Sequence, residues 1–102
     1  MQTSAHLFSL NRWRHQHAAT RNARADRLHR LWRIAAGNFR EASARYDMAN
    51  AAFDEAAPLS ASRTQARRQM LSAISAMNHW NRRSAALARA EIATVLGGAA
   101  HA

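Results

Sequence analysis

Residues 25–56 decide the fold, and they read ADRLHRLWRIAAGNFREASARYDMANAAFDEA. Apolar residues recur through this stretch in steps that alternate between three and four, which is the spacing of a helix that packs along one seam. One seam position holds aromatic residues and the other mainly alanine: Trp32, Phe39, Tyr46 and Phe53 against Leu28, Ala35, Ala42, Ala49 and Ala56. Large residues that alternate with small ones let a facing helix approach closely. The pattern predicts a long helix packed against a second one.

Glycine and proline set the expected ends of this helix. Gly37 and Asn38 offer an alternative end inside it, because glycine commonly follows the last turn of a helix. We favour one continuous helix, since the seam passes through both residues in register. Pro58 ends the helix, because the residue before a proline is pushed out of the α region. We therefore expect a turn at residues 57–60, with Ser60 or Ser62 capping the next helix.

The second helix is expected to run to about Leu96, where Gly97-Gly98 supplies a stop. Its apolar stripe is broader and less regular: Ala66, Met70, Ala73, Ile74, Met77, Trp80, Leu87, Ala88, Ile92 and Val95. The predicted fold class is all-α, a long antiparallel helical hairpin over residues 19–96 with a flexible tail at residues 97–102. The basic and aromatic segment 1–18 carries Leu7, Phe8, Leu10 and Trp13, enough for a short helix laid across the hairpin.

A hairpin of two helices leaves much of each aromatic ring exposed. Either the N-terminal segment covers the open groove, or two copies pair as a four-helix bundle. A homodimer is therefore one of the expected states of the chain.

Composition bounds the class of protein. A chain of 102 residues with 48% apolar residues fits one small domain. One proline and three glycines leave too few turns for a many-stranded β fold. The absence of cysteine excludes disulfides and thiolate metal sites and fits a reducing compartment, and no apolar run reaches the roughly 20 residues that span a bilayer. We expect a cytoplasmic protein that does not enter the membrane.

The charge predicts an anionic partner. The formal net charge is +9, and all fifteen basic residues are arginine. Codon usage in a GC-rich genome is one explanation; the other is that guanidinium binds phosphate or carboxylate through two hydrogen bonds, which lysine cannot do. Residues 41–70 carry four arginines and four carboxylates, so the excess lies toward the open end of the expected hairpin. Nucleic acid and an acidic protein surface are the partners that such an excess favours.

The candidate binding residues are ten arginines and one tryptophan: Arg12, Trp13, Arg14, Arg21, Arg24, Arg27, Arg30, Arg33, Arg82, Arg83 and Arg89. The arginines from 21 to 33 recur every third residue, so on a helix they wind around the axis and could follow a phosphate backbone. The alternative is a solvated helix surface. Trp13 stands between two arginines, as stacking rings do in single-strand binding sites; a packing anchor is the alternative.

No catalytic motif is evident in the sequence. His15 and His17 are two residues apart and point to different sides of a helix, and Asp26 with His29 has no evident third metal ligand. The sequence has no glycine-rich phosphate loop and no nucleophile motif. We expect no cofactor, no metal and no enzyme activity. The first hypothesis is a nucleic-acid binder with little sequence specificity. The second is a small interaction module or inhibitor, for example phage- or plasmid-borne, that docks on an acidic protein surface.

Overall fold

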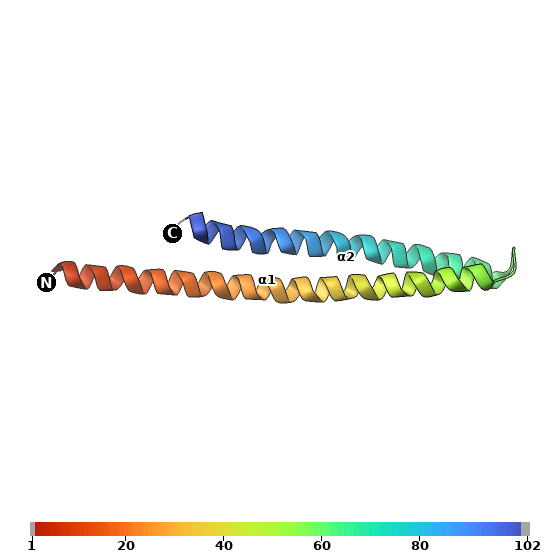
Figure 1. Ribbon diagram of the computed structural model, residues 1–102, viewed down its shortest axis with the longest axis horizontal. Helices are drawn as coiled ribbons and strands as arrows, with labels where there is room; N and C mark the ends of the chain where they lie inside the picture. Colours follow the sequence, from red (N-terminus) through yellow and green to blue (C-terminus); the bar gives the residue numbers. More distant parts are fainter. Residues whose placement is uncertain (1, 101–102) are drawn as a thin grey trace. The chain divides into compact units, whose positions relative to one another are not determined.

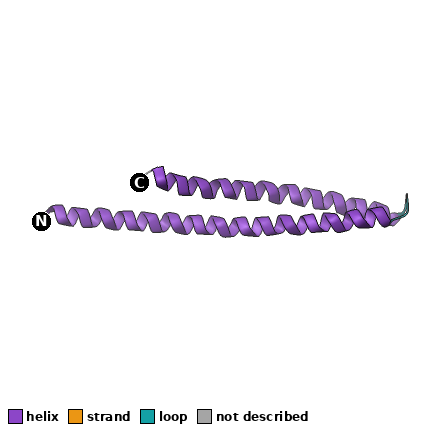
Figure 2. Ribbon diagram, viewed as in Figure 1, coloured by secondary structure: helices purple, strands orange, loops and turns teal. Residues whose placement is uncertain are grey.

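The chain folds into two long antiparallel helices. The computed structural model describes the backbone of residues 2–100 and the side chains of residues 9–97. Helix α1 spans Gln2–Glu55 and helix α2 spans Ala61–Ala100, and they run in opposite directions from the turn that joins them (Figure 1). Within the described backbone there is no strand (Figure 2). The predicted all-α hairpin is confirmed.

The turn forms where the sequence predicts it. The Ser60 amide donates a hydrogen bond to the Ala57 carbonyl at 3.2 Å, and Leu59 has a φ of 61°. Proline at the second position and a positive φ at the third are the marks of a type II turn. The Ser60 hydroxyl then accepts a hydrogen bond of 3.1 Å from the Arg63 amide. Ser60, and not Ser62, is therefore the residue that caps α2.

Helix α1 continues through Gly37, as the unbroken seam predicted. The outer ends of the helices differ from the prediction. Residues 2–18 form the first turns of α1 instead of a separate short helix, and α2 passes through Gly97 to reach Ala100. Glycine permits the left-handed conformation of a helix stop but does not require it, and no described glycine has a positive φ. The side chains of Leu7 and Phe8, and residues 101–102 of the expected tail, lie outside the described residues.

Contacts divide the chain into two compact units. Unit 1 comprises Met1–Leu31 with Leu87–Ala102, and unit 2 comprises Trp32–Ala86. Each unit therefore contains one segment of α1 and one segment of α2. Unit 2 also contains the turn.

Alanine forms the buried seam of unit 2. Ala35, Ala42 and Ala49 of α1 and Ala66 and Ala73 of α2 are at most 4% exposed. The aromatic residues of the alternate seam position are only partly buried, because two helices cannot enclose a large ring. The small residues of the predicted alternation thus lie at the close contact between the helices, and the large residues lie beside it.

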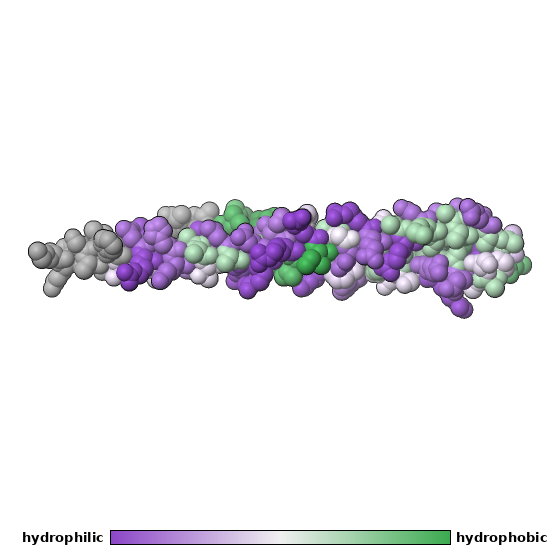
Figure 3. All heavy atoms as spheres, turned by 90° about the horizontal axis from the view of Figure 1, so that it is seen from below, coloured by the Kyte–Doolittle hydropathy of each residue, from purple (hydrophilic) through white to green (hydrophobic). Residues whose placement is uncertain are grey.

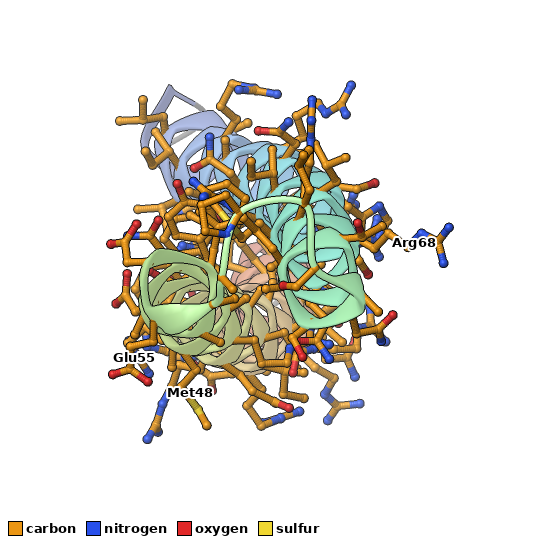
Figure 4. All side chains as sticks on the ribbon, turned by 90° about the vertical axis from the view of Figure 1, so that its right-hand side faces the viewer. Met48, Glu55 and Arg68 are labelled. Carbon is orange, nitrogen blue, oxygen red and sulfur yellow. The ribbon has the colours of Figure 1, made fainter. Side chains whose placement is uncertain are left out.

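The outward positions of unit 2 carry charged and isolated apolar side chains. Figure 4 shows Met48 and Glu55 projecting from the outer surface of α1, and Arg68 pointing away from α1. Figure 3 shows a mainly hydrophilic face with small, separate hydrophobic patches. Apolar side chains exposed singly are ordinary on a protein surface.

Candidate nucleic-acid interface

A groove in unit 1 gathers polar and basic side chains from α1 over small residues of α2. We call it the basic groove. Its volume is about 450 Å³. Its α1 side is lined by four residues that share one face of the helix, and its α2 side by small residues: His17, Thr20, Arg21 and Arg24 against Ala90, Ala93, Thr94 and Gly97.

The helical spacing of the α1 residues explains why they meet. His17, Thr20 and Arg24 are three and four residues apart, so their side chains stand on one face of α1. Thr94 follows Ala90 by four residues, and Gly97 follows Thr94 by three, which places them on one face of α2 in the same way. Because alanine, threonine and glycine are small, this face of α2 leaves the space that forms the groove.

The two guanidinium groups are the free hydrogen-bond donors of the basic groove. Arg21 is partly buried and Arg24 is exposed, and within the described residues neither side chain forms a hydrogen bond or an ion pair. Each guanidinium therefore keeps five N–H donors for a ligand. The two threonine hydroxyls donate to carbonyls of their own helices: Thr20 to Gln16 at 2.9 Å and Thr94 to Ala90 at 2.8 Å. The groove thus presents guanidinium donors that have no protein acceptor among the described residues.

A pair of stacked rings adjoins the basic groove. Trp13 and His17 have ring centroids 5.1 Å apart and planes inclined by only 8°. His17 lines the groove, while the Trp13 side chain is 60% exposed. The indole is therefore mostly outside the contact between α1 and α2.

The structure separates the candidate residues into three groups. Arg21 and Arg24 line the basic groove, with Trp13 beside it. Five other candidates are exposed elsewhere in unit 1: Arg12, Arg14, Arg27, Arg30 and Arg89. The remaining candidates are exposed in unit 2: Arg33, Arg82 and Arg83. Arg82 donates from Nε to the Asn78 carbonyl of its own helix at 3.3 Å.

Both compact units carry an excess of positive charge. Unit 1 has seven arginines and two carboxylates, a net charge of +5, and unit 2 has eight arginines and four carboxylates, a net charge of +4. The excess in unit 2 comes from arginines outside the neutral stretch 41–70: Arg33, Arg40, Arg82 and Arg83. Unit 1 is the shorter of the two, so its charge density is higher.

His29 contacts the second helix. Its Nδ1 atom lies 3.2 Å from a carboxylate oxygen of Glu91, which joins α1 to α2 within unit 1. Among the described residues no group of three histidine, aspartate or glutamate side chains could hold a metal ion.

Sequence reasoning missed four of the residues that form this interface: His17 as a stacking partner, Thr20, Thr94 and Gly97. One signal could have found the α1 members. Trp13, His17, Thr20 and Arg24 follow one another in steps of four, three and four, the spacing of a single helix face. Ala90, Thr94 and Gly97 share one face of α2 by the same kind of spacing, but which part of α1 they meet depends on the register between the two helices, and the sequence of one helix does not show that register.

Comparison with known proteins gives no relative: no family model, no curated protein and no solved structure matches the chain. Among the described residues, neither helix contains an apolar stretch long enough to cross a bilayer.

Proposed function

We propose that the chain is a non-enzymatic nucleic-acid-binding protein that holds the phosphate backbone in the basic groove, with little sequence specificity. One observation carries the proposal: the guanidinium groups of Arg21 and Arg24, neither with a protein partner among the described residues, line a single groove. They do so in a unit of net charge +5. Unpaired like charges in one groove repel each other, and a bound anion relieves that repulsion.

The chemistry of the groove fits phosphate. A guanidinium presents its donors in a planar fork that matches two phosphate oxygens. The small side chains of Ala90, Ala93 and Gly97 leave room for a backbone to approach. Phosphate contacts of this kind fix position but carry no sequence information, which is why we expect little specificity.

The stacked Trp13–His17 pair adds a contact for unpaired bases. Proteins that bind single strands combine basic grooves with aromatic rings on which bases stack, and each such contact contributes about 1–3 kcal/mol. The exposed indole face beside the basic groove supplies that combination. Single-stranded nucleic acid is therefore the preferred substrate.

Fluorescence anisotropy of labelled oligonucleotides, with nuclease-treated protein at low salt, tests the proposal. The variant Arg21→Gln/Arg24→Gln should lose about 1–2 kcal/mol of binding energy, roughly a five- to thirtyfold rise in Kd. The charge-matched control is Arg45→Gln/Arg68→Gln, which removes two exposed arginines of unit 2. Equal weakening by both variants would show that only overall charge matters, and would refute the groove as the site.

Substitution of the indole separates stacking from backbone contact. Trp13→Ala should weaken binding to a single strand by about five- to a hundredfold and leave duplex binding nearly unchanged. Because the indole is mostly exposed, the melting temperature should not fall. A parallel loss of stability and binding would instead assign Trp13 a structural role.

A further inference from the structure

Unit 2 has an unusually small core. All of its buried side chains are alanine: Ala35, Ala42, Ala49, Ala66 and Ala73. Alanine buries little apolar area, so these contacts bring the helices together but withdraw little hydrocarbon from water. The larger apolar residues of this unit remain at least partly exposed, and they are not scattered evenly around it.

One side of unit 2 carries several of these residues, and we call it the aromatic face; Ile34 and Met48 are exposed singly elsewhere. On α1 it carries Phe39, Tyr46 and Phe53, seven residues apart and partly buried. On α2 the guanidinium of Arg63 lies 4.2 Å from the centre of the Phe53 ring, which fixes the side of α2 that adjoins the aromatic row. Met70 and Met77 follow Arg63 at intervals of seven, and Ile74, 40% exposed, stands between them.

A row of charges borders the aromatic face along α1. Arg33, Arg40, Asp47 and Asp54 each follow an aromatic residue by one position, so they lie on its flank, away from the alanine seam. All four side chains are exposed. The residues of unit 2 are all described, and none of its carboxylates forms an ion pair.

The order of these charges is self-complementary. Two copies of the row that run in opposite directions place Arg33 opposite Asp54 and Arg40 opposite Asp47, in both directions at once. The symmetry axis then passes level with the Ser43–Ala44 bond. Counting along α2 from Arg63, which lies over Phe53, the same level falls between Ser72 and Ala73. Ile74 is the apolar residue of the aromatic face on α2 nearest to this level, so it lies close to its own copy across the axis.

We propose that the chain forms a homodimer in which two copies of unit 2 pack aromatic face against aromatic face, with their turns at opposite ends. The contact is isologous, as two-fold symmetry requires, and it completes a four-helix bundle. The partner's apolar side chains cover the rings that one hairpin leaves exposed. The four arginine–aspartate pairs along the two copies of α1 set the register.

Paired charge reversals test this arrangement on the full chain. The variant Asp47→Arg/Asp54→Arg makes the row wholly positive, and Arg33→Asp/Arg40→Asp makes it wholly negative. Each variant alone should lose self-association, so that its mass in light scattering falls from twice the chain mass to the 11.4 kDa of one chain. An equimolar mixture of the two should regain the double mass. Circular dichroism verifies that each variant stays helical.

The outcomes are distinct. Recovery of the double mass on mixing supports the antiparallel dimer, because only that arrangement places the two altered rows against each other. A wild-type chain that is monomeric at high micromolar concentration overturns the proposal. Dimerisation of Arg33→Asp/Arg40→Asp alone would also overturn the proposal. It would indicate a parallel dimer, in which Asp47 and Asp54 face the partner's α2 and Arg33 and Arg40 form no pair. Arg45→Asp/Arg68→Asp, which lies outside the face, should leave the mass unchanged.

Discussion

Replacement of Ala42 by leucine tests whether the alanine seam is packed. Ala42 is 0% exposed, so the side chain has no open space around it. Leucine adds three carbon atoms at this position while changing helix propensity little, since alanine and leucine are both strong helix formers. Overpacking of a close contact costs about 1–3 kcal/mol. For a domain of this size each kcal/mol corresponds to about 4–8 °C, so the melting temperature should fall by about 4–24 °C.

Ala44→Leu is the matched control, because Ala44 lies on the exposed side of the same helix. Its effect should stay within about 0.5 kcal/mol. Thermal and urea denaturation followed by circular dichroism, at one fixed protein concentration, measures both variants. If the helices were not in close contact at Ala42, leucine would gain burial and raise the melting temperature. An unchanged or raised value for Ala42→Leu would therefore refute the packed seam.

Three further substitutions test individual positions of the hairpin by the same measurement. Gly37→Ala should stabilise the chain by about 0.5–1 kcal/mol, because glycine is unfavourable inside a helix and the added methyl group meets only the Arg40 guanidinium at 4.0 Å; destabilisation would show that α1 breaks there. Leu59→Gly should stabilise it by about 0.5–1 kcal/mol, since Leu59 holds a φ of 61° and is fully exposed; a loss of stability would contradict the strained turn. Ser60→Ala should cost about 1 kcal/mol by removing the cap of α2, and no change would mean that the bond to Arg63 contributes nothing.

The sequence predicts the middle of the hairpin well for a physical reason. Alternating aromatic and alanine positions, a proline and a capping serine are local signals, and each one points to the same structure. The partial exposure of the aromatic rings can also be predicted from the sequence, because two helices cannot enclose a large ring.

The outer part of the chain is harder to predict. The seam of alternating aromatic and alanine residues begins at Ala25, and before it, among the described side chains, only Ala18 and Arg21 are partly buried at the same spacing. Alanine, arginine and glutamine, which are good helix formers, favour a helix in residues 2–24. The basic groove needs Thr94 and Gly97 of α2 beside Arg21 of α1. Whether these residues meet depends on how α2 is aligned along α1, and the two segments are far apart in the sequence. Arg21 and Arg24 could be named as candidates from their charge, but not distinguished from the other arginines.

The salt dependence of binding tests the basic groove most directly. Each phosphate neutralised on a single strand contributes about 0.7 to the slope of log K against log salt concentration. With a single-stranded oligonucleotide, the slope of Arg21→Gln/Arg24→Gln should therefore be shallower than that of the wild-type chain by about 1.4, while the slope of Arg45→Gln/Arg68→Gln stays close to the wild-type value. Equal slopes for the wild-type chain and the groove variant, or binding that persists above about half-molar salt, would contradict the account.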